Sequence, residues 1–190
     1  MSIVEDYVTS QLLQIVKLYN VALTNTITAI LNSSLMIYFF KKKYNRQEKT
    51  FPEIRIYELG SLPIPKNIVP NKNIDESVNL MLEVNKKLQT TKQNFINELE
   101  LEKITKKLQN FEELEFDMFI KEYKKAKKLK FANKLEERNF KNEWRDLFEN
   151  DKKEALDLKS QIDTTDNEID KMVYELYGLS EDEIALVEGR

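Results

Sequence analysis

The chain of 190 residues contains no cysteine, no histidine and only three glycines. Without cysteine or histidine there is no zinc site of the usual kind, no thiolate nucleophile and no serine–histidine–aspartate relay. Gly60, Gly178 and Gly189 are too far apart for a glycine-rich phosphate loop. We therefore expect no cofactor and no metal site. The lack of cysteine also suits a cytoplasmic location.

Proline is confined to one part of the chain, because all four prolines lie between residues 52 and 70. From Asp75 to Gly178 neither proline nor a further glycine interrupts the chain, which predicts long helices. Gly178 is placed as a helix C-cap, and Ser180 with Glu183 predicts a capping box for a short final helix. A strict alternation of three and four residues near the end is typical of a coiled-coil seam. The seam residues are Ala155, Leu158, Ile162, Thr165, Ile169, Met172 and Leu176.

A second apolar stripe begins at Ile74, and the two stripes together predict an antiparallel hairpin of long helices. The N-terminal part predicts helices as well, with a break near residues 32–34, where Asn32 and Ser33 would satisfy backbone groups at a bend. The uncharged stretch Val21–Phe40 has the length of a membrane span. Its polar side chains make a buried helix the preferred interpretation, and no membrane partner is expected.

Residues 44–73 have a different character. The alternating run Ile54-Arg55-Ile56-Tyr57 predicts a short, half-buried strand. Leu62-Pro63-Ile64-Pro65 predicts a rigid connector, because proline restricts itself and the residue before it. The predicted fold is therefore mainly α, a coiled-coil-like antiparallel hairpin with a small α/β part. The predicted domains are residues 1–73 and residues 74–190.

The net charge of −3 conceals strong local charge. Residues 41–49 carry five cations and one acid, residues 121–134 carry seven lysines and one acid, and residues 161–190 carry nine acids and two cations. Lysine-rich helices are commonly just solvated surfaces, but such clusters also neutralise DNA phosphates without reading the base sequence. The candidate DNA-binding residues are Lys41, Lys42, Lys43, Arg46 and Lys49 in the first cluster and Lys124, Lys125 and Lys128 in the second.

Three stretches, in a fixed order, resemble the C-terminal end of bacterial adenine-N6 DNA methyltransferases of restriction–modification systems. The closest resemblance is to Type IIG restriction–methylation enzymes with a TaqI-like C-terminal specificity region. Type I specificity subunits share the same order of features. The stretches are Ile30–Leu35 with Tyr38–Lys43, Phe51–Ile56 with Leu59–Pro65, and Ile169–Ser180 with Glu183–Glu188.

This resemblance implies double-stranded DNA as one partner and a methyltransferase or restriction core, in the same parent chain or a separate subunit, as another. Residues 20–65 correspond to the closing part of a target-recognition domain and residues 74–178 to a helical spacer. The first basic cluster, next to that recognition part, is expected to contact phosphate. Tyr174, Tyr177 and Gly178 are expected to form a packing end of the hairpin.

The departures from the family pattern concern catalysis. The Asn/Asp-Pro-Pro-Tyr/Phe motif that holds a flipped adenine needs a Pro-Pro pair, and this chain has none. We also find no glycine-rich turn for a methyl donor and no convincing nuclease site. The sequence therefore predicts a non-catalytic DNA-specificity and scaffolding module. The open alternatives are a helical protein–protein interaction module that does not bind DNA, including a homodimer through the seam, and a membrane-associated protein.

Overall fold

The computed structural model describes residues 16–44 and 55–190, and within these ranges every regular element is helical. This confirms the prediction of a mainly α fold. The elements form two compact units, residues 82–163 and the remainder, each of which is described separately below. Their bounds are η1 Val21–Leu23, α1 Thr24–Asn32, α2 Ser34–Tyr44, α3 Ile56–Leu59, α4 Lys72–Glu98, α5 Lys106–Gln109, η2 Phe111–Glu113, α6 Phe116–Lys127, α7 Lys134–Tyr177 and α8 Glu181–Glu188.

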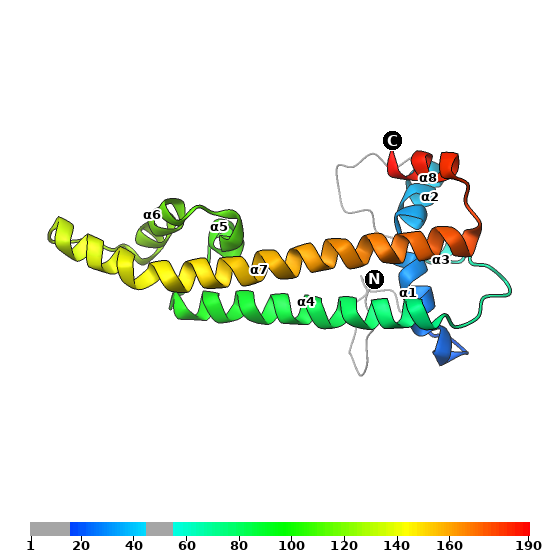
Figure 1. Cartoon of the computed structure of the whole chain (residues 1–190), viewed down its shortest axis with the longest axis horizontal. Coiled ribbons are helices and arrows are strands. Elements are labelled where there is room, and N and C mark those ends of the chain that lie inside the picture. The colour runs from blue at the N-terminus through cyan, green and yellow to red at the C-terminus, as the bar shows by residue number, and fades with distance from the viewer. Residues whose placement is uncertain (1–15, 45–54) are drawn as a thin grey trace. The chain divides into compact units, whose positions relative to one another are not determined.

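Helices α4 and α7 continue from one unit into the other, and within each unit a stretch of α4 packs against a stretch of α7 (Figure 1). In the first unit, made of the described residues up to 81 together with residues 164–190, Ile74 and Val78 share a core with Ile169 and Val173. Each pair of core residues is four apart, so one helical face of α4 meets one face of α7. The predicted pairing of two long helices is therefore confirmed.

In the second unit the two helices run antiparallel. Lys87 Nζ lies 3.3 Å from a carboxylate oxygen of Glu154, whereas the Phe95 ring, about two turns further along α4, contacts Phe148 earlier in α7. Rising residue numbers in one helix thus meet falling numbers in the other, as the hairpin prediction requires.

The predicted coiled-coil seam faces the interior of the chain. Every seam position is buried or half-buried, and Ala155 has no exposed surface at all. Thr165, the one polar position, is 3% exposed. An apolar stripe that is already covered by its own chain is a core face. The seam is consequently not an open surface for a second molecule.

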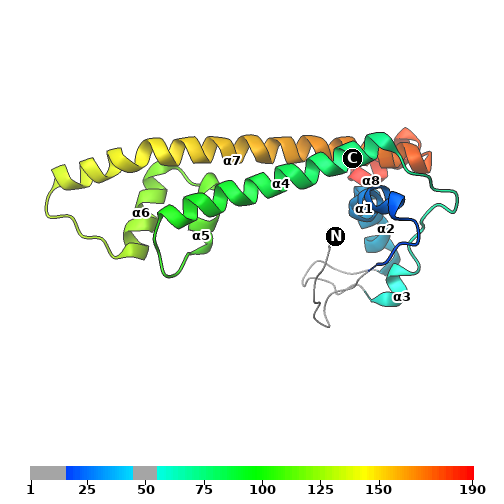
Figure 2. The same cartoon turned by 90° about the horizontal axis from the view of Figure 1, so that it is seen from below.

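Aromatic rings form the core of the second unit. The rings of Phe95 and Phe111 stack with centroids 3.8 Å apart, and those of Phe119 and Phe148 stack at 4.7 Å. Because these residues come from α4, η2, α6 and α7, the cluster joins four elements of this unit. Figure 2 shows α5 and α6 beside the paired stretches of α4 and α7 in this unit.

The predicted helix break near residues 32–34 is confirmed. Helix α1 ends at Asn32 and α2 begins at Ser34, with a bend of 57° between the η1–α1 segment and α2. The Ser33 hydroxyl donates to the Ile30 carbonyl oxygen over 2.8 Å and accepts from the Met36 N–H over 3.3 Å. Polar side chains at such bends satisfy backbone groups that the interrupted helix leaves free.

The predicted strand at residues 54–57 is wrong for the residues that the structure describes. Ile54 lies outside the described residues, Arg55 is extended, and Ile56–Leu59 form the one-turn helix α3. The turn is stabilised locally, because the Glu58 carboxylate accepts the Arg55 N–H over 2.7 Å. Alternation predicts that Ile56 is buried, yet 74% of this residue is exposed. A short i, i+3 cap therefore outweighs the β-preference of two isoleucines.

The predicted packing end of the hairpin is confirmed in the first unit. The Tyr177 hydroxyl donates to the carbonyl oxygen of Pro63 over 2.9 Å, which fixes the proline connector to the end of α7. Tyr174 is buried, and its burial, together with the nearby Asp170 carboxylate, raises the pKa of its hydroxyl. Gly178 has a φ of +66°, the left-handed geometry of a C-cap.

The short final helix also forms as predicted. The Ser180 hydroxyl accepts the Glu183 N–H over 3.4 Å, and the Glu183 carboxylate accepts the Ser180 N–H over 2.8 Å. These two bonds lower the pKa of the Glu183 carboxyl. The capping box therefore starts α8 directly after the C-cap of α7.

Within residues 16–44 and 55–190, no single helix has the length and apolar character of a membrane span. Only the bent pair Val21–Asn32 and Ser34–Tyr44 meets those criteria when taken together.

Candidate functional site

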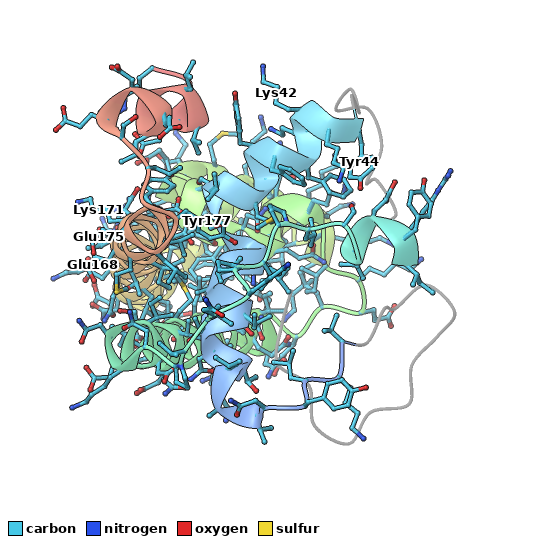
Figure 3. The ribbon with its side chains drawn as sticks, turned by 90° about the vertical axis from the view of Figure 1, so that its right-hand side faces the viewer. Lys42, Tyr44, Glu168, Lys171, Glu175 and Tyr177 are labelled. Atoms are coloured by element: carbon cyan, nitrogen blue, oxygen red, sulfur yellow. The ribbon has the colours of Figure 1, made fainter. Side chains whose placement is uncertain are left out.

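The first predicted basic cluster lies in the last turn of α2. Lys41, Lys42 and Lys43 follow one another there and are all exposed, and Figure 3 shows Lys42 extending outward from the end of the helix. A helix C-terminus carries partial negative charge, so lysines are favoured at this position. Arg46 and Lys49, the other members of this cluster, lie outside the described residues.

Neutral groups contact two lysines of this turn, Lys42 and Lys43. The Lys43 ammonium donates to the Ser61 carbonyl oxygen over 3.3 Å and lies 5.1 Å from the centre of the Phe39 ring. Lys42 lies over the Tyr38 ring at 5.5 Å. Because a carbonyl group and aromatic rings carry no net charge, these contacts orient the two ammonium groups without neutralising them.

The position of α2 is fixed from α7. The Ser34 N–H, at the start of α2, donates to the Asp170 carboxylate over 2.8 Å. Asp170 is 9% exposed, so this charge-assisted bond is largely shielded from water. Ile30 and Met36, on either side of the bend, also pack in the same core as Val173 of α7. Helix α7 therefore determines where the basic turn of α2 is presented.

The second predicted cluster lies at the end of α6, in the other unit. Lys124 is already engaged, since its ammonium donates to the Glu137 carboxylate over 3.0 Å and lies 4.6 Å from the Phe131 ring centre. This bond lowers the pKa of the Glu137 carboxyl. Lys125 and Lys128 are exposed, and Lys128 ends the helix in the left-handed conformation, with φ 55°. The structure thus places each cluster in a separate unit.

One charged centre was not predicted from the sequence. Glu112 in η2 is 1% exposed, and one of its carboxylate oxygens accepts hydrogen bonds from Lys92 of α4 over 2.7 Å and from Lys159 of α7 over 3.0 Å. Burial by itself raises the pKa of this carboxyl, but the two lysines outweigh burial and the net pKa is lowered. The lysines come 20 residues before and 47 residues after Glu112, so no local sequence pattern indicates the contact.

The described residues offer little for metal chemistry. Over residues 16–44 and 55–190, no three carboxylates gather in a way that could hold a metal ion. The side chains at the end of α2, Lys42 and Lys43 over the rings of Tyr38 and Phe39, are cationic and aromatic, which suits binding to an anionic surface.

Two family models match segments of the chain. Residues 69–173, more than half of the sequence, match the family model of a domain of unknown function (DUF8810). The chain belongs to this family. Residues 4–64 match the model of the TaqI-like C-terminal specificity domain, which confirms the resemblance to a TaqI-like specificity region. No curated protein and no solved structure matches.

The two matches divide the candidate sites between them. The TaqI-like match contains the helix break at Ser33, the basic turn of α2 and all of α3. The DUF8810 match contains the buried Glu112 and the second basic cluster. Of the three stretches that carried the resemblance, the last one, from Ile169 onward, lies outside the TaqI-like match.

Proposed function

We propose that this DUF8810 protein is the non-catalytic DNA-specificity and scaffolding module of an adenine-N6 methyltransferase from a restriction–modification system, acting in the cytoplasm. One observation carries the proposal. The part of the chain that matches the TaqI-like C-terminal specificity domain also presents the exposed turn Lys41–Lys43. A specificity domain acts on DNA, and exposed lysines supply the phosphate contacts that such a domain needs.

In the proposed mechanism the lysines hold and orient the DNA backbone, and they do not read bases. The Asp170 bond to Ser34 and the shared core keep α2 fixed on the stretch of α7 in the same unit, so the basic turn has a defined place relative to that stretch. We assign residues 1–73 to the recognition part and residues 74–190 to the spacer. The spacer would connect to a methyltransferase or restriction core, in the same parent chain or in a separate subunit.

Catalysis is assigned to that core and not to this chain. The sequence has no Pro-Pro pair for the adenine-binding motif, and its three glycines are scattered. Lys125 and Lys128 are proposed as secondary phosphate contacts, whereas Lys124 contributes less because Glu137 already compensates its charge.

The alternative function, a helical interaction module without DNA binding, relied on the seam between Ala155 and Leu176. That seam is covered by the chain itself. A homodimer through this surface would require the hairpin to open, so the DNA-binding proposal is favoured.

The proposal is tested by DNA binding across a salt series. Fluorescence anisotropy with a random-sequence duplex compares the unmodified chain with the variant Lys41→Ala/Lys42→Ala/Lys43→Ala. We expect weaker binding and a log Kd versus log[salt] slope reduced by about 2–3, because each phosphate contact contributes about 0.9 to the slope.

The matched control is Lys66→Ala/Lys72→Ala/Lys171→Ala, which removes three exposed lysines from the same unit. This control variant loses the same net charge as the Lys41–Lys43 variant, but it should bind the duplex only slightly more weakly than the unmodified chain does. The proposal is overturned if the unmodified chain does not bind the duplex at low salt, or if the two triple variants bind alike.

A further inference from the structure

Helix α3 presents two large side chains to solvent. Ile56 is 74% exposed and Tyr57 is 61% exposed. Both lie in the first half of a one-turn helix, next to each other in sequence. Burying such side chains against a partner is favourable, because it removes apolar surface from water.

Helix α3 is only one turn long, and local hydrogen bonds close both of its ends. The Glu58 carboxylate accepts the Arg55 N–H over 2.7 Å, and the Gly60 N–H donates to the Ile56 carbonyl oxygen over 3.1 Å. Glu58 itself is only 1% exposed. The Ser61 hydroxyl donates to the Glu58 carbonyl oxygen over 2.9 Å. The exposed pair therefore stands on a turn with fixed ends and loses little conformational entropy on binding.

The turn is attached to the basic end of α2. The hydroxyl groups of Tyr44 and Ser61 are hydrogen-bonded to each other, and Lys43 donates to the Ser61 carbonyl oxygen. In Figure 3, Tyr44 lies at the end of α2 beside α3. On the α3 side, an Arg55 guanidinium N–H donates to the Tyr57 hydroxyl over 3.2 Å. Lysines and apolar side chains thus share one surface.

The charge of this surface indicates the kind of partner. Residues 34–44 and 55–61 contain four cations, Lys41, Lys42, Lys43 and Arg55, and the single acid Glu58. Glu58, in α3, is buried, whereas the four cations are exposed. A surface with this charge that also carries a protruding apolar pair complements a polyanion whose interior is apolar. Duplex DNA has this chemistry, with phosphates outside and stacked bases inside.

We propose that Ile56 and Tyr57 form an apolar wedge that enters a DNA groove at a base step, while the lysines of α2 hold the flanking phosphates. The inference rests on the proposed function and adds to it a preference for DNA whose base steps are easily deformed. Inserting apolar side chains between base pairs unstacks them and bends the duplex. Flexible pyrimidine–purine steps are deformed at lower cost than stiff A-tracts. The wedge would therefore favour sites with a flexible step.

The experiment separates insertion from phosphate contact. Duplexes labelled with a fluorophore at each end, containing either a central TA step or an A-tract, report bending by energy transfer and affinity by titration. The test variant is Ile56→Ala/Tyr57→Ala. The control is Val69→Ala/Leu186→Ala, which removes two apolar side chains that are 67% and 62% exposed in the same unit.

We expect the unmodified chain and the control to bend the TA duplex and to bind it more tightly than the A-tract. The wedge variant should bind the TA duplex about tenfold more weakly, a loss of about 1.4 kcal/mol. Its bending signal should disappear, while the salt slope, which reports phosphate contacts, should stay the same.

The experiment distinguishes failure of the wedge proposal from failure of the proposed function. Absence of binding by the unmodified chain overturns both the wedge and the proposed function. Lysine-dependent binding in which the wedge variant matches the control overturns the wedge and leaves the proposed function standing. Sedimentation provides a further check. A smaller assembly for the wedge variant, with DNA bending unchanged, would make this patch a protein contact and overturn the wedge.

Discussion

At the scale of single residues, the buried carboxylate of Glu112 in the second unit depends on partners that stabilise its charge. Its carboxylate is removed from water, and a buried charge is tolerated only when hydrogen bonds compensate it. Lys92 and Lys159 provide this compensation from two different helices. Lys159 also bonds to Glu113 over 3.1 Å, and the bond to Glu112 is the main cause that raises the pKa of its ammonium. The centre therefore fixes η2 between α4 and α7.

We predict that Glu112→Gln lowers the free energy of unfolding at pH 7 by about 1–3 kcal/mol, because two partly buried lysines lose their anionic partner. The pKa of Glu112 is lowered in the folded state. Its contribution is therefore complete above the ordinary value of 4.5 and is lost as the pH falls through the folded pKa below it. Urea denaturation at a series of pH values, followed by the fluorescence of Trp144, should show a shallower acid limb for the variant.

Glu113→Gln is the control for this prediction. The Glu113 side chain bonds to the same Lys159 but is 60% exposed, so its removal should change stability by less than about 1 kcal/mol. Equal stability curves for the two variants would show that the buried carboxylate has no special role.

Residues whose role depends on close neighbours in sequence were predicted correctly. Ser33, Gly178 and Ser180 all satisfy backbone groups within a few positions of themselves, and such roles follow from local helix chemistry. Glu112 and Asp170 were not singled out, because Asp170 meets its partner 136 residues away. Tertiary contacts of that kind leave no periodic pattern in the sequence.

At the scale of elements, periodicity was reliable where it extended over several turns and unreliable over four residues. The seam in α7 repeats over three heptads, and every seam position is at least half-buried. The run around Ile56 alternates only once, and a local cap decides its conformation instead. The basic clusters were located by composition, but only the structure separates the engaged Lys124 from the exposed Lys125.

The seam of α7 provides a test at this scale. We predict that Leu158→Asp destabilises the chain by about 3 kcal/mol or more, because Leu158 is 6% exposed and a buried, unpaired charge is among the most costly substitutions. Leu156→Asp is the control, since Leu156 is 43% exposed on the same helix. Thermal unfolding followed by circular dichroism should show a large drop in Tm for the first variant only. An oligomer that dissociates while keeping its helicity would instead identify the seam as an interface between chains.

At the scale of the whole molecule, the chain forms two compact units, of which only one is continuous in sequence. Residues 82–163 make up one unit, whereas the other combines residues from both ends of the chain. The sequence predicted the hairpin but not this interleaving, because α4 and α7 pass from one unit to the other without any breaker residue. Each unit has its own core, aromatic in one and aliphatic with Met36 in the other.

We predict that residues 82–163, expressed alone, fold into the second unit. The fragment contains every residue of the aromatic core, from Leu88 to Ala155. Trp144, the only tryptophan of the chain, lies 4.8 Å from Tyr123 between ring centroids. The fragment should therefore show a near-ultraviolet circular dichroism signal and one cooperative melting transition.

Phe119→Ala is the informative variant of this fragment, because Phe119 is fully buried and the loss of its ring costs about 3–5 kcal/mol. A unit of this length has a total stability of about 4–12 kcal/mol, so the variant should lose a large part of that stability and melt at a clearly lower temperature than the unmodified fragment. Helicity without a cooperative transition in the unmodified fragment would show that the second unit needs the rest of α4 and α7 to fold.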